Sequence, residues 1–188
     1  DPETLSDIDI ILKHTRNVQT IVRDLLSLSR PKQVISGKCS INKVISKAIE
    51  VFKTQSASKE ISVNSYLKNN LPDIKCDAAI LEQILTNLWL NAFDAIQDSG
   101  GEINISTQLA KKDHVLLCIE DNGPGIPDHV ISQIFDPFYT TKEVGKGTGL
   151  GLSVVYGFIN EIGGRIEVES DETTVFNIFF PVDKPEDN

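Results

Sequence analysis

A glycine-rich segment, Gly145-Lys-Gly-Thr-Gly-Leu-Gly-Leu152, leads directly into a stretch at 152–162 whose apolar residues have helical spacing. Alternate glycines leave backbone N–H groups bare and permit positive φ, so an anion or another backbone can come close. A helix N-terminus also favours negative charge. The segment is therefore a candidate phosphate-binding loop, and a flexible surface loop fits it about equally well. Neither the GxxxxGK[ST] nor the GxGxxG spacing is present.

Two carboxamides lie on one face of a largely apolar segment at 78–97. Asn87 and Asn91 are four residues apart, and Asp94 follows one turn later on the same face of a helix. Buried carboxamides need partners, because desolvating them without hydrogen bonds is costly. Mg²⁺ with phosphate oxygens would satisfy them, since this ion takes oxygen ligands and keeps several waters. The alternative is a pair of core amides that bond within the protein.

Two further clusters carry groups suited to a ligand. Asp121-Asn-Gly-Pro-Gly125 follows an apolar strand at 115–119, so the Asp121 carboxylate is well placed to accept from a ligand amino group. An ordinary Asp-Asn-Gly turn is the simpler interpretation of that local sequence. The second cluster, at 134–142, packs aromatic residues against a proline and then offers hydroxyls and Lys142. The alternative interpretation is a hydrophobic latch for a loop, which is compatible with a functional role.

Together and in this order, the four clusters resemble the ATP-binding domain of sensor histidine kinases. These kinases belong to the superfamily that also holds the gyrase, heat-shock chaperone and mismatch-repair ATPases. Residues 87–91 resemble the N box, 121–125 the first G box, 135–138 the F box and 147–152 the second G box. Each box alone is weak, and their shared order makes a chance match very improbable.

The resemblance implies that the domain binds ATP or ADP with Mg²⁺ and transfers the γ-phosphoryl group to a histidine. Asp121 would accept the adenine amino group, Gly125 would let the base approach, and Asn91 would hold Mg²⁺. Asn87 and Lys142 would complete the catalytic set with Asn91. The other implied nucleotide contacts are Asp94, Gly123, Ile126, Phe138, Thr140, Thr141, Lys146, Gly147, Thr148, Gly149, Leu150, Gly151, Leu152 and Thr174.

Two positions depart from patterns in the superfamily. Asn87 stands where the ATP-hydrolysing members carry a glutamate that activates water, so we expect very slow hydrolysis here. At 172–175, Glu-Thr-Thr-Val replaces a segment in which relatives often show a glycine, which leaves the adenine-side contact of Thr174 open.

Two other function classes remain as alternatives. One is a nucleotide-dependent binding module, which would be free to lose Asn91 or Lys142. The other is an ATPase of the gyrase or chaperone type, against which Asn87 and the short lid argue.

The elements that position these clusters can be placed from periodicity and capping residues. Ser40 and Asp77 are candidate N-caps, and the Gly163-Gly164 pair is a good helix stop. Alternating helices and strands with apolar faces predict an α+β, two-layer sandwich. The resemblance implies a Bergerat-type ATP-binding fold, with a mixed sheet of about five strands and three main helices. The expected elements are helices at 41–54, 78–97, 127–135 and 150–162, strands at 60–67, 74–76, 102–109, 114–121, 165–169 and 175–180, and a mobile loop at 136–149.

One long amphipathic helix is predicted ahead of this domain. Apolar residues recur at alternating three- and four-residue steps between Ile8 and Ser29, a stripe wide enough for a bundle, and Pro31 closes the helix. The resemblance implies that 1–31 is the second helix of a dimerisation and histidine-phosphotransfer hairpin, 32–40 a linker, 41–182 the catalytic domain and 183–188 a polar tail. It further implies a homodimer in the full-length protein and a response-regulator receiver domain as partner.

The three histidines do not carry the phosphoacceptor motif of the family. We expect His14 to flank the bundle, and His114 and His129 to lie at the surface. The acceptor, its helix and any membrane segments would then lie upstream of Asp1.

Composition is that of an ordinary soluble domain. The chain has 188 residues, 40% of them apolar, and a net charge of −9, which argues against nucleic acid as a partner. No apolar run approaches the roughly 18–20 residues that span a bilayer. Three scattered cysteines indicate reduced thiols rather than a disulfide or zinc framework. We expect a cytoplasmic protein, or the cytoplasmic portion of a membrane-bound sensor.

Overall fold

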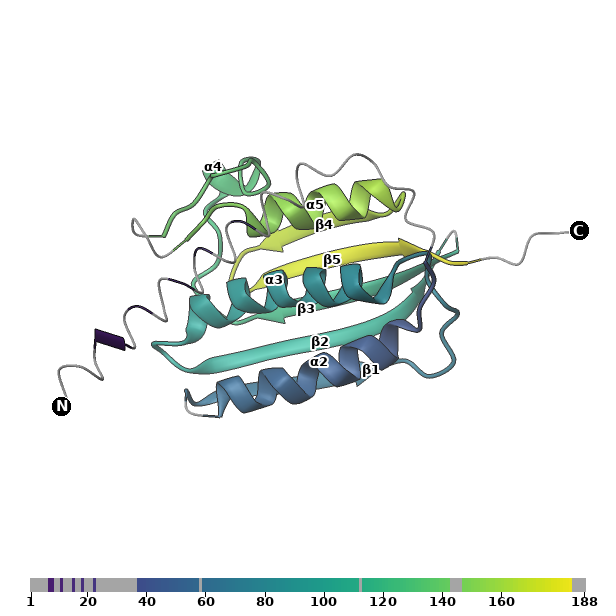
Figure 1. The fold of residues 1–188 in the computed structure, drawn as a ribbon, viewed down its shortest axis with the longest axis horizontal. Coiled ribbons are helices and arrows are strands. Elements are labelled where there is room, and N and C mark those ends of the chain that lie inside the picture. Colours follow the sequence, from purple (N-terminus) through teal and green to yellow (C-terminus); the bar gives the residue numbers. More distant parts are fainter. Residues whose placement is uncertain are drawn as a thin grey trace, which may run out of the picture.

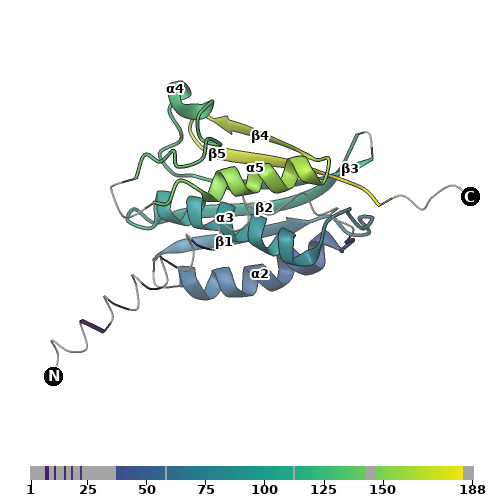
Figure 2. The same ribbon diagram turned by 45° about the horizontal axis from the view of Figure 1, so that its top comes forward.

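The computed structural model describes residues 7, 8, 11, 15, 18, 22, 37–57, 59–111, 113–142 and 147–183. Most of this chain forms an α+β, two-layer sandwich, in which one five-stranded mixed sheet carries its long helices on a single face (Figure 1, Figure 2). The helices are α2 Ile41–Ser56, α3 Ala78–Ile96, α4 Asp128–Ile131 and α5 Gly151–Glu161, and the strands are β1 Ile61–Leu67, β2 Gly101–Ala110, β3 His114–Asp121, β4 Arg165–Ser170 and β5 Thr174–Pro181.

The strands lie in the order β1-β2-β3-β5-β4. β1 pairs with β2 in parallel, and the pairs β2–β3, β3–β5 and β4–β5 are antiparallel. In β3 every second side chain is buried under the helices, from Val115 through Leu117 and Ile119 to Asp121. Asp121 thus continues the core-facing row, and the register places Thr174 of β5 directly opposite it.

Helix α3 lies between α2 and α5 over the sheet (Figure 1). Trp89 stacks on Phe52 of α2 with ring centroids 4.3 Å apart and the planes nearly parallel. On the other side, the side chain of Asn87 reaches the first residue of α5. The apolar face of α3 is fully buried and includes Leu81, Ile84, Leu85, Leu88, Trp89, Ala92 and Ile96.

Two local predictions were wrong, and a third holds in position only. Ser40 occupies the N-cap of α2, as predicted, and makes no side-chain capping bond. Residues 74–76 form no strand: Ile74 alone makes isolated bridges, to Cys39 and to Val182, because Cys76 N–H turns back onto the Ile74 carbonyl. The helix expected at 127–135 is only the four-residue α4. Beyond it, bonds from Gln133 to Val130 and from Asp136 to Gln133 continue as three-residue turns.

The predicted cap of α3 is confirmed, since an Asp77 carboxylate oxygen accepts from Ala79 N–H at 2.8 Å. We expect Asp77→Ala to lower the free energy of unfolding by about 1 kcal/mol, because the bond satisfies an otherwise unpaired N–H at the helix start. Chemical denaturation would measure the change. Asp98→Ala, just beyond the opposite end of the same helix, is the matched control and should be neutral or slightly stabilising. Equal losses from both variants would contradict the capping role.

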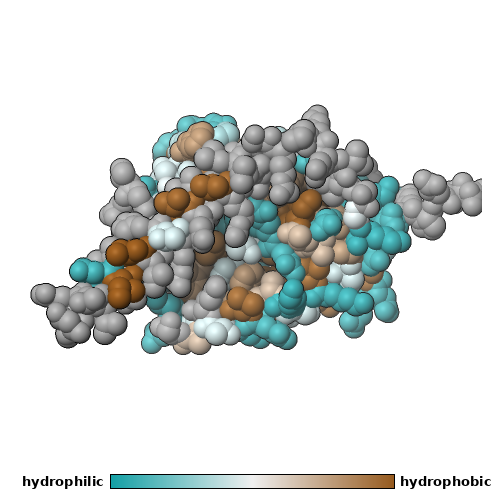
Figure 3. All heavy atoms as spheres, viewed as in Figure 1, coloured by the Kyte–Doolittle hydropathy of each residue, from teal (hydrophilic) through white to brown (hydrophobic). Residues whose placement is uncertain are grey.

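The described positions of the N-terminal segment are helical. Thr15 Oγ1 donates to the Ile11 carbonyl four residues earlier, as a helix allows. Ile8, Ile11, Val18 and Val22 are exposed, and Figure 3 shows brown, hydrophobic residues at the surface near the N-terminal end. The rest of 1–31, including His14, and most of the expected linker lie outside the described residues. Among the described helices, none is long and apolar enough to cross a membrane.

The three cysteines are unpaired thiols. Cys76 is buried in the core, and this burial raises the pKa of its thiol to about 12. A thiol held protonated in this way is a poor nucleophile.

Candidate nucleotide site

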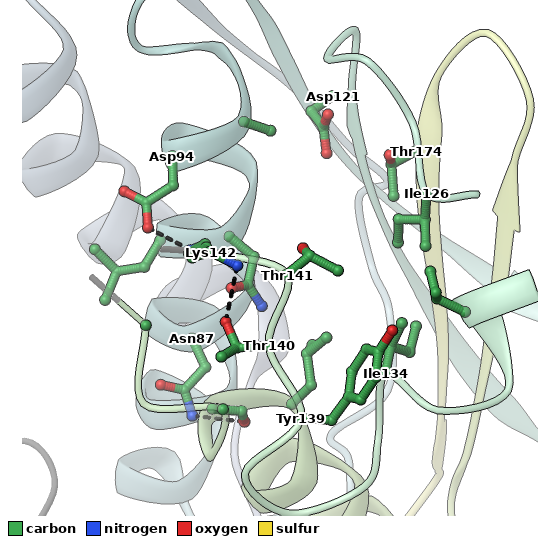
Figure 4. A pocket seen from close by; sticks show the side chains of 18 of the residues that line it. Asn87, Asp94, Asp121, Ile126, Ile134, Tyr139, Thr140, Thr141, Lys142 and Thr174 are labelled. Carbon is green, nitrogen blue, oxygen red and sulfur yellow. Dashed lines mark hydrogen bonds and ion pairs between the residues drawn. The ribbon is translucent and has the colours of Figure 1, made fainter. Parts of the chain in front are cut away.

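A pocket of about 650 Å³ opens between α3, the loop after β3 and the segment that leads into α5 (Figure 4). This volume is in the range of small-molecule and cofactor sites. The pocket unites segments far apart in the sequence, and most of the predicted site residues line it. They are Asn87, Asn91, Asp94, Asp121, Gly125, Ile126, Thr140, Thr141, Lys142, Gly147, Thr148, Gly149, Gly151, Leu152 and Thr174.

Three predicted residues do not line this pocket. Gly123 donates its N–H to an Asp121 oxygen at 3.0 Å, and Leu150 is buried at the start of α5. Phe138 is 66% exposed, with a left-handed φ of 68°. Lys146 lies outside the described residues, so its predicted role stays a prediction.

Sequence reasoning missed an apolar wall of the pocket. Val130 and Ile134 are four residues apart and Phe176 belongs to the core-facing row of β5, so each has the pattern of an ordinary core residue. Periodicity shows that a side chain faces inward and does not show whether it meets protein or a cavity. The missed lining residues are Leu90, Ala95, Pro124, Pro127, Val130, Ile134, Tyr139 and Phe176.

Asp121 is the buried charge at one end of the pocket, with 4% of its surface exposed. Burial raises the pKa of its carboxyl to about 6, and the bond from Gly123 N–H partly offsets this rise. A Cβ on Gly123 would lie 2.7 Å from Asp121 Oδ1, so only glycine fits beside the carboxylate. At neutral pH the side chain is an ionised, poorly solvated acceptor, which binds a ligand N–H donor strongly.

The floor beside Asp121 is built by close backbone approach. Gly125 has a φ of 77°, and a Cβ there would lie 3.0 Å from the Asp171 carbonyl oxygen of the β4–β5 turn. Thr174, opposite Asp121, is 5% exposed and lines the pocket. Figure 4 shows Asp121, Thr174 and Ile126 along one side of the cavity.

The other end of the pocket is polar and comes from α3 and the segment at 139–149. Asn87 Nδ2 donates to the Gly151 carbonyl at 3.2 Å and so holds the start of α5. Lys142 Nζ forms an ion pair with Asp94 Oδ2, and both side chains are about one-third exposed. No group of three or more His, Cys, Asp and Glu among the described residues could hold a metal ion. Asn91, on the same helix, lines this end of the pocket, and a carboxamide oxygen is a ligand that Mg²⁺ accepts when phosphates and waters supply the rest.

The two described ends of the loop at 138–149 are fastened to each other. Phe138 N–H donates to the Gly149 carbonyl at 2.9 Å. A Cβ on Gly149 would lie 2.4 Å from the Phe138 carbonyl carbon, and one on Gly147 would lie 2.6 Å from Thr140 Oγ1. Close packing thus requires glycine at 147 and 149, and the left-handed φ of 65° favours it further at Gly149.

Residues 76–184 match the family described as histidine kinase-, DNA gyrase B-, and HSP90-like ATPase. Sensor kinase CckA of Brucella abortus is 36% identical over 96% of this chain and 20% of its own length. Sporulation kinase E of Bacillus subtilis is 32% identical over 93% of the chain and 23% of its own. Sensor histidine kinase ZraS of Salmonella typhimurium is 33% identical over 92% of the chain and 37% of its own length. The chain thus spans well under half of each of these relatives.

Solved structures show the same likeness. The catalytic domain of histidine kinase ThkA is 29% identical, with a TM-score of 0.69 over 78% of this chain and 95% of that one. ThkA in complex with the response regulator protein TrrA is 28% identical, with a TM-score of 0.75 over 100% of this chain and 54% of that one. The chain therefore belongs to the histidine kinase-, DNA gyrase B- and HSP90-like ATPase family, among the catalytic ATP-binding domains of sensor histidine kinases.

Proposed function

We propose that this chain is the ATP-binding catalytic core of a sensor histidine kinase. It transfers the γ-phosphoryl group of Mg-ATP to a histidine side chain, for relay to an aspartate of a response regulator. One observation carries the proposal: a single cavity of nucleotide size holds a buried carboxylate, Asp121, at one end and Asn91 with Lys142 at the other. These are the groups that the two ends of ATP require.

The base end recognises adenine. The ionised Asp121 accepts from the adenine amino group, a charge-assisted bond that contributes about 1.5–3 kcal/mol. Gly125 has no side chain to keep the base from the loop, and Ile126 and Thr174 line the same side of the cavity.

The phosphate end neutralises charge. Asn91 would hold Mg²⁺ through its amide oxygen, and the ion would supply positive charge beside the phosphates. Lys142 leaves its ion pair with Asp94 and pairs with the phosphates instead. The predicted contact of Lys146 would neutralise further phosphate charge. Gly147, Thr148, Gly149 and Gly151 present backbone N–H groups near the start of α5, where the helix dipole favours anions.

The residues of the chain position the reaction and supply no covalent nucleophile, because phosphoryl transfer needs mainly orientation and charge stabilisation. Asn87 cannot take a proton from water, so bound ATP is kept for transfer to histidine. The acceptor imidazole is delivered by the dimerisation bundle of a homodimer, to which the N-terminal helical segment belongs. The receiver domain of a response regulator is the downstream partner, and the reaction takes place in the cytoplasm.

The test follows label from γ-labelled Mg-ATP into a separate peptide that carries the phosphoacceptor helix of the family. We expect acid-labile, base-stable label on the peptide and little free phosphate. Asn91→Ala should lower the transfer rate by about 100-fold, since it removes a metal ligand at the reacting phosphates. Asn160→Ala, an exposed asparagine on α5, is the matched control and should leave the rate unchanged.

Other outcomes assign the chain to the alternative classes. Rapid multiple-turnover release of phosphate by the wild type would overturn the kinase proposal in favour of an ATPase. Tight nucleotide binding without transfer to any helix peptide would point to a binding module.

A further inference from the structure

Ser170, the last residue of β4, joins two walls of the base end of the pocket without lining it. Its Oγ accepts from Ile126 N–H at 2.6 Å, in the loop that follows Asp121. The same oxygen lies 3.5 Å from Thr174 Oγ1 in β5. No sequence motif singled out this serine, because Ile126, which donates to it, lies 44 residues away in the chain.

The side chain lies at the end of a row that crosses three strands. In the sheet register Asp121 of β3 is opposite Thr174 of β5, and Thr174 is opposite Ser170 of β4. Alternation along each strand places all three side chains on the helix-covered face. Directly opposed side chains have Cβ atoms about 4.5–5.5 Å apart, so a ligand on Asp121 also comes within reach of Thr174.

The loop at 123–127 lies directly against the β4–β5 turn. A Cβ on Gly125 would approach the Asp171 carbonyl oxygen to 3.0 Å and Ser170 Oγ to 3.3 Å. With this close packing, the bond between Ser170 and Ile126 fixes how far the loop stands from Thr174.

The hydroxyl of Ser170 also orients a proton. A serine oxygen has one proton to donate and two lone pairs. Since one lone pair receives the short bond from Ile126 N–H, the oxygen is polarised into a better donor, and Thr174 Oγ1 is its neighbour. The 3.5 Å separation allows either hydroxyl to be the donor. With Ser170 as the donor, Thr174 accepts and its own proton is left to point into the pocket.

This arrangement gives the base end a defined polarity: Asp121 offers an acceptor, and Thr174 beside it offers a donor. A 6-aminopurine presents a donor, the amino group, next to an acceptor, ring nitrogen N1. A 6-oxopurine presents the reverse order on that edge, with a carbonyl acceptor next to an N1–H donor.

We propose that Ser170 is a positioning residue that fixes the Thr174 hydroxyl as a donor to ring nitrogen N1, directly or through one water, and thereby favours 6-aminopurine over 6-oxopurine nucleotides. The inference rests on the proposed function, namely that the pocket holds a purine nucleotide.

The experiment measures dissociation constants by titration calorimetry for ADP, 1-deazaadenosine diphosphate, which lacks N1, and inosine diphosphate. We expect Ser170→Ala to weaken ADP binding about tenfold, in line with the loss of an oriented hydrogen bond at a buried site. For the 1-deaza compound, the same substitution should change the dissociation constant by less than about twofold, because the atom that Thr174 contacts is absent. The preference for ADP over inosine diphosphate should shrink accordingly.

Two further variants complete the test. Ser62→Ala, at an exposed position on the opposite edge strand β1, is the matched control and should alter none of the three constants. Ser170→Cys replaces the hydroxyl with a weak donor and acceptor and leaves no cavity, and it should reproduce the ADP-selective loss if the alanine variant does not fold.

The outcomes separate this inference from the proposed function. Equal weakening of ADP and the 1-deaza compound, or an unchanged ADP constant, would overturn the role of Ser170 while adenine binding stands. Wild-type protein that binds no adenine nucleotide would overturn the proposed function and this inference with it.

Discussion

Asp121→Asn is expected to weaken ADP binding by about 100-fold or more while raising the melting temperature of the nucleotide-free protein at pH 7.5. Asparagine keeps an oxygen for the Gly123 N–H bond. It replaces the other carboxylate oxygen with an amino group, which faces the adenine amino group donor to donor. In the ADP complex the variant thus loses a charge-assisted bond and sets two donors against each other.

The stability change has the opposite sign because Asp121 is a buried charge with one described N–H partner. Burial raises the pKa of its carboxyl from 3.8 to about 6. A carboxyl whose folded pKa is raised stabilises the protein below the unfolded pKa, and this contribution is lost as pH rises through about 6. At pH 7.5 the ionised group therefore costs on the order of 3 kcal/mol, which asparagine removes.

The same linkage sets the pH dependence. The difference in melting temperature between Asp121→Asn and wild type should be largest above pH 7 and shrink steadily as pH falls from about 6 towards 4. Wild-type affinity for ADP should fall below pH 6, since a protonated Asp121 loses its charge. Differential scanning calorimetry and isothermal titration across this range would measure both effects.

Asp98→Asn makes the same change of charge at an exposed position and is the matched control. It should leave the melting temperature and the ADP affinity near those of wild type. A lower melting temperature for Asp121→Asn at pH 7.5 would contradict the cost assigned to the buried charge. An unchanged ADP dissociation constant would contradict the assignment of Asp121 as the base acceptor.

The features predicted correctly from sequence are those that depend on local periodicity. The apolar run at 115–119 indicates a buried strand with Asp121 at its end, and the spacing of Asn87 and Asn91 places both on the pocket side of α3. The cap at Asp77 follows from residue type before an apolar helix. In each case one segment contains all the information that the prediction needs.

The features that sequence could not predict depend on pairing between distant segments. The ion pair of Lys142 with Asp94 joins residues 48 apart, and the Ser170–Ile126 bond joins residues 44 apart. The failure of Ser40 to cap α2 has the same character, because its residue type allows a bond that the local geometry does not make. Residue types indicated which groups the site would contain, and tertiary packing decides which of them touch.

Gly149→Ala is expected to reduce phosphotransfer by about 100-fold, the order of loss that misplacement of catalytic groups produces, while the sheet and α3 stay folded. The glycine has a left-handed φ of 65°. An added Cβ would lie 2.4 Å from the Phe138 carbonyl carbon and 2.7 Å from its Cα and oxygen. These are backbone atoms, so no change of rotamer relieves the clash, and the segments before and after the loop must separate.

That separation breaks the bond from Phe138 N–H to the Gly149 carbonyl and moves Thr140 and Lys142 away from the phosphate end. Gly157→Ala supplies a control with the same chemical change and the opposite expectation, because a Cβ there meets nothing within 4 Å in the exposed interior of α5. It should leave transfer unchanged and stabilise the protein by about 0.5–1 kcal/mol. If Gly149→Ala transferred phosphate at the wild-type rate, the close contact with Phe138 would not be needed to hold the loop for catalysis. Comparing the two variants thus distinguishes a steric clash at the loop from the general effect of replacing a glycine with alanine in this domain.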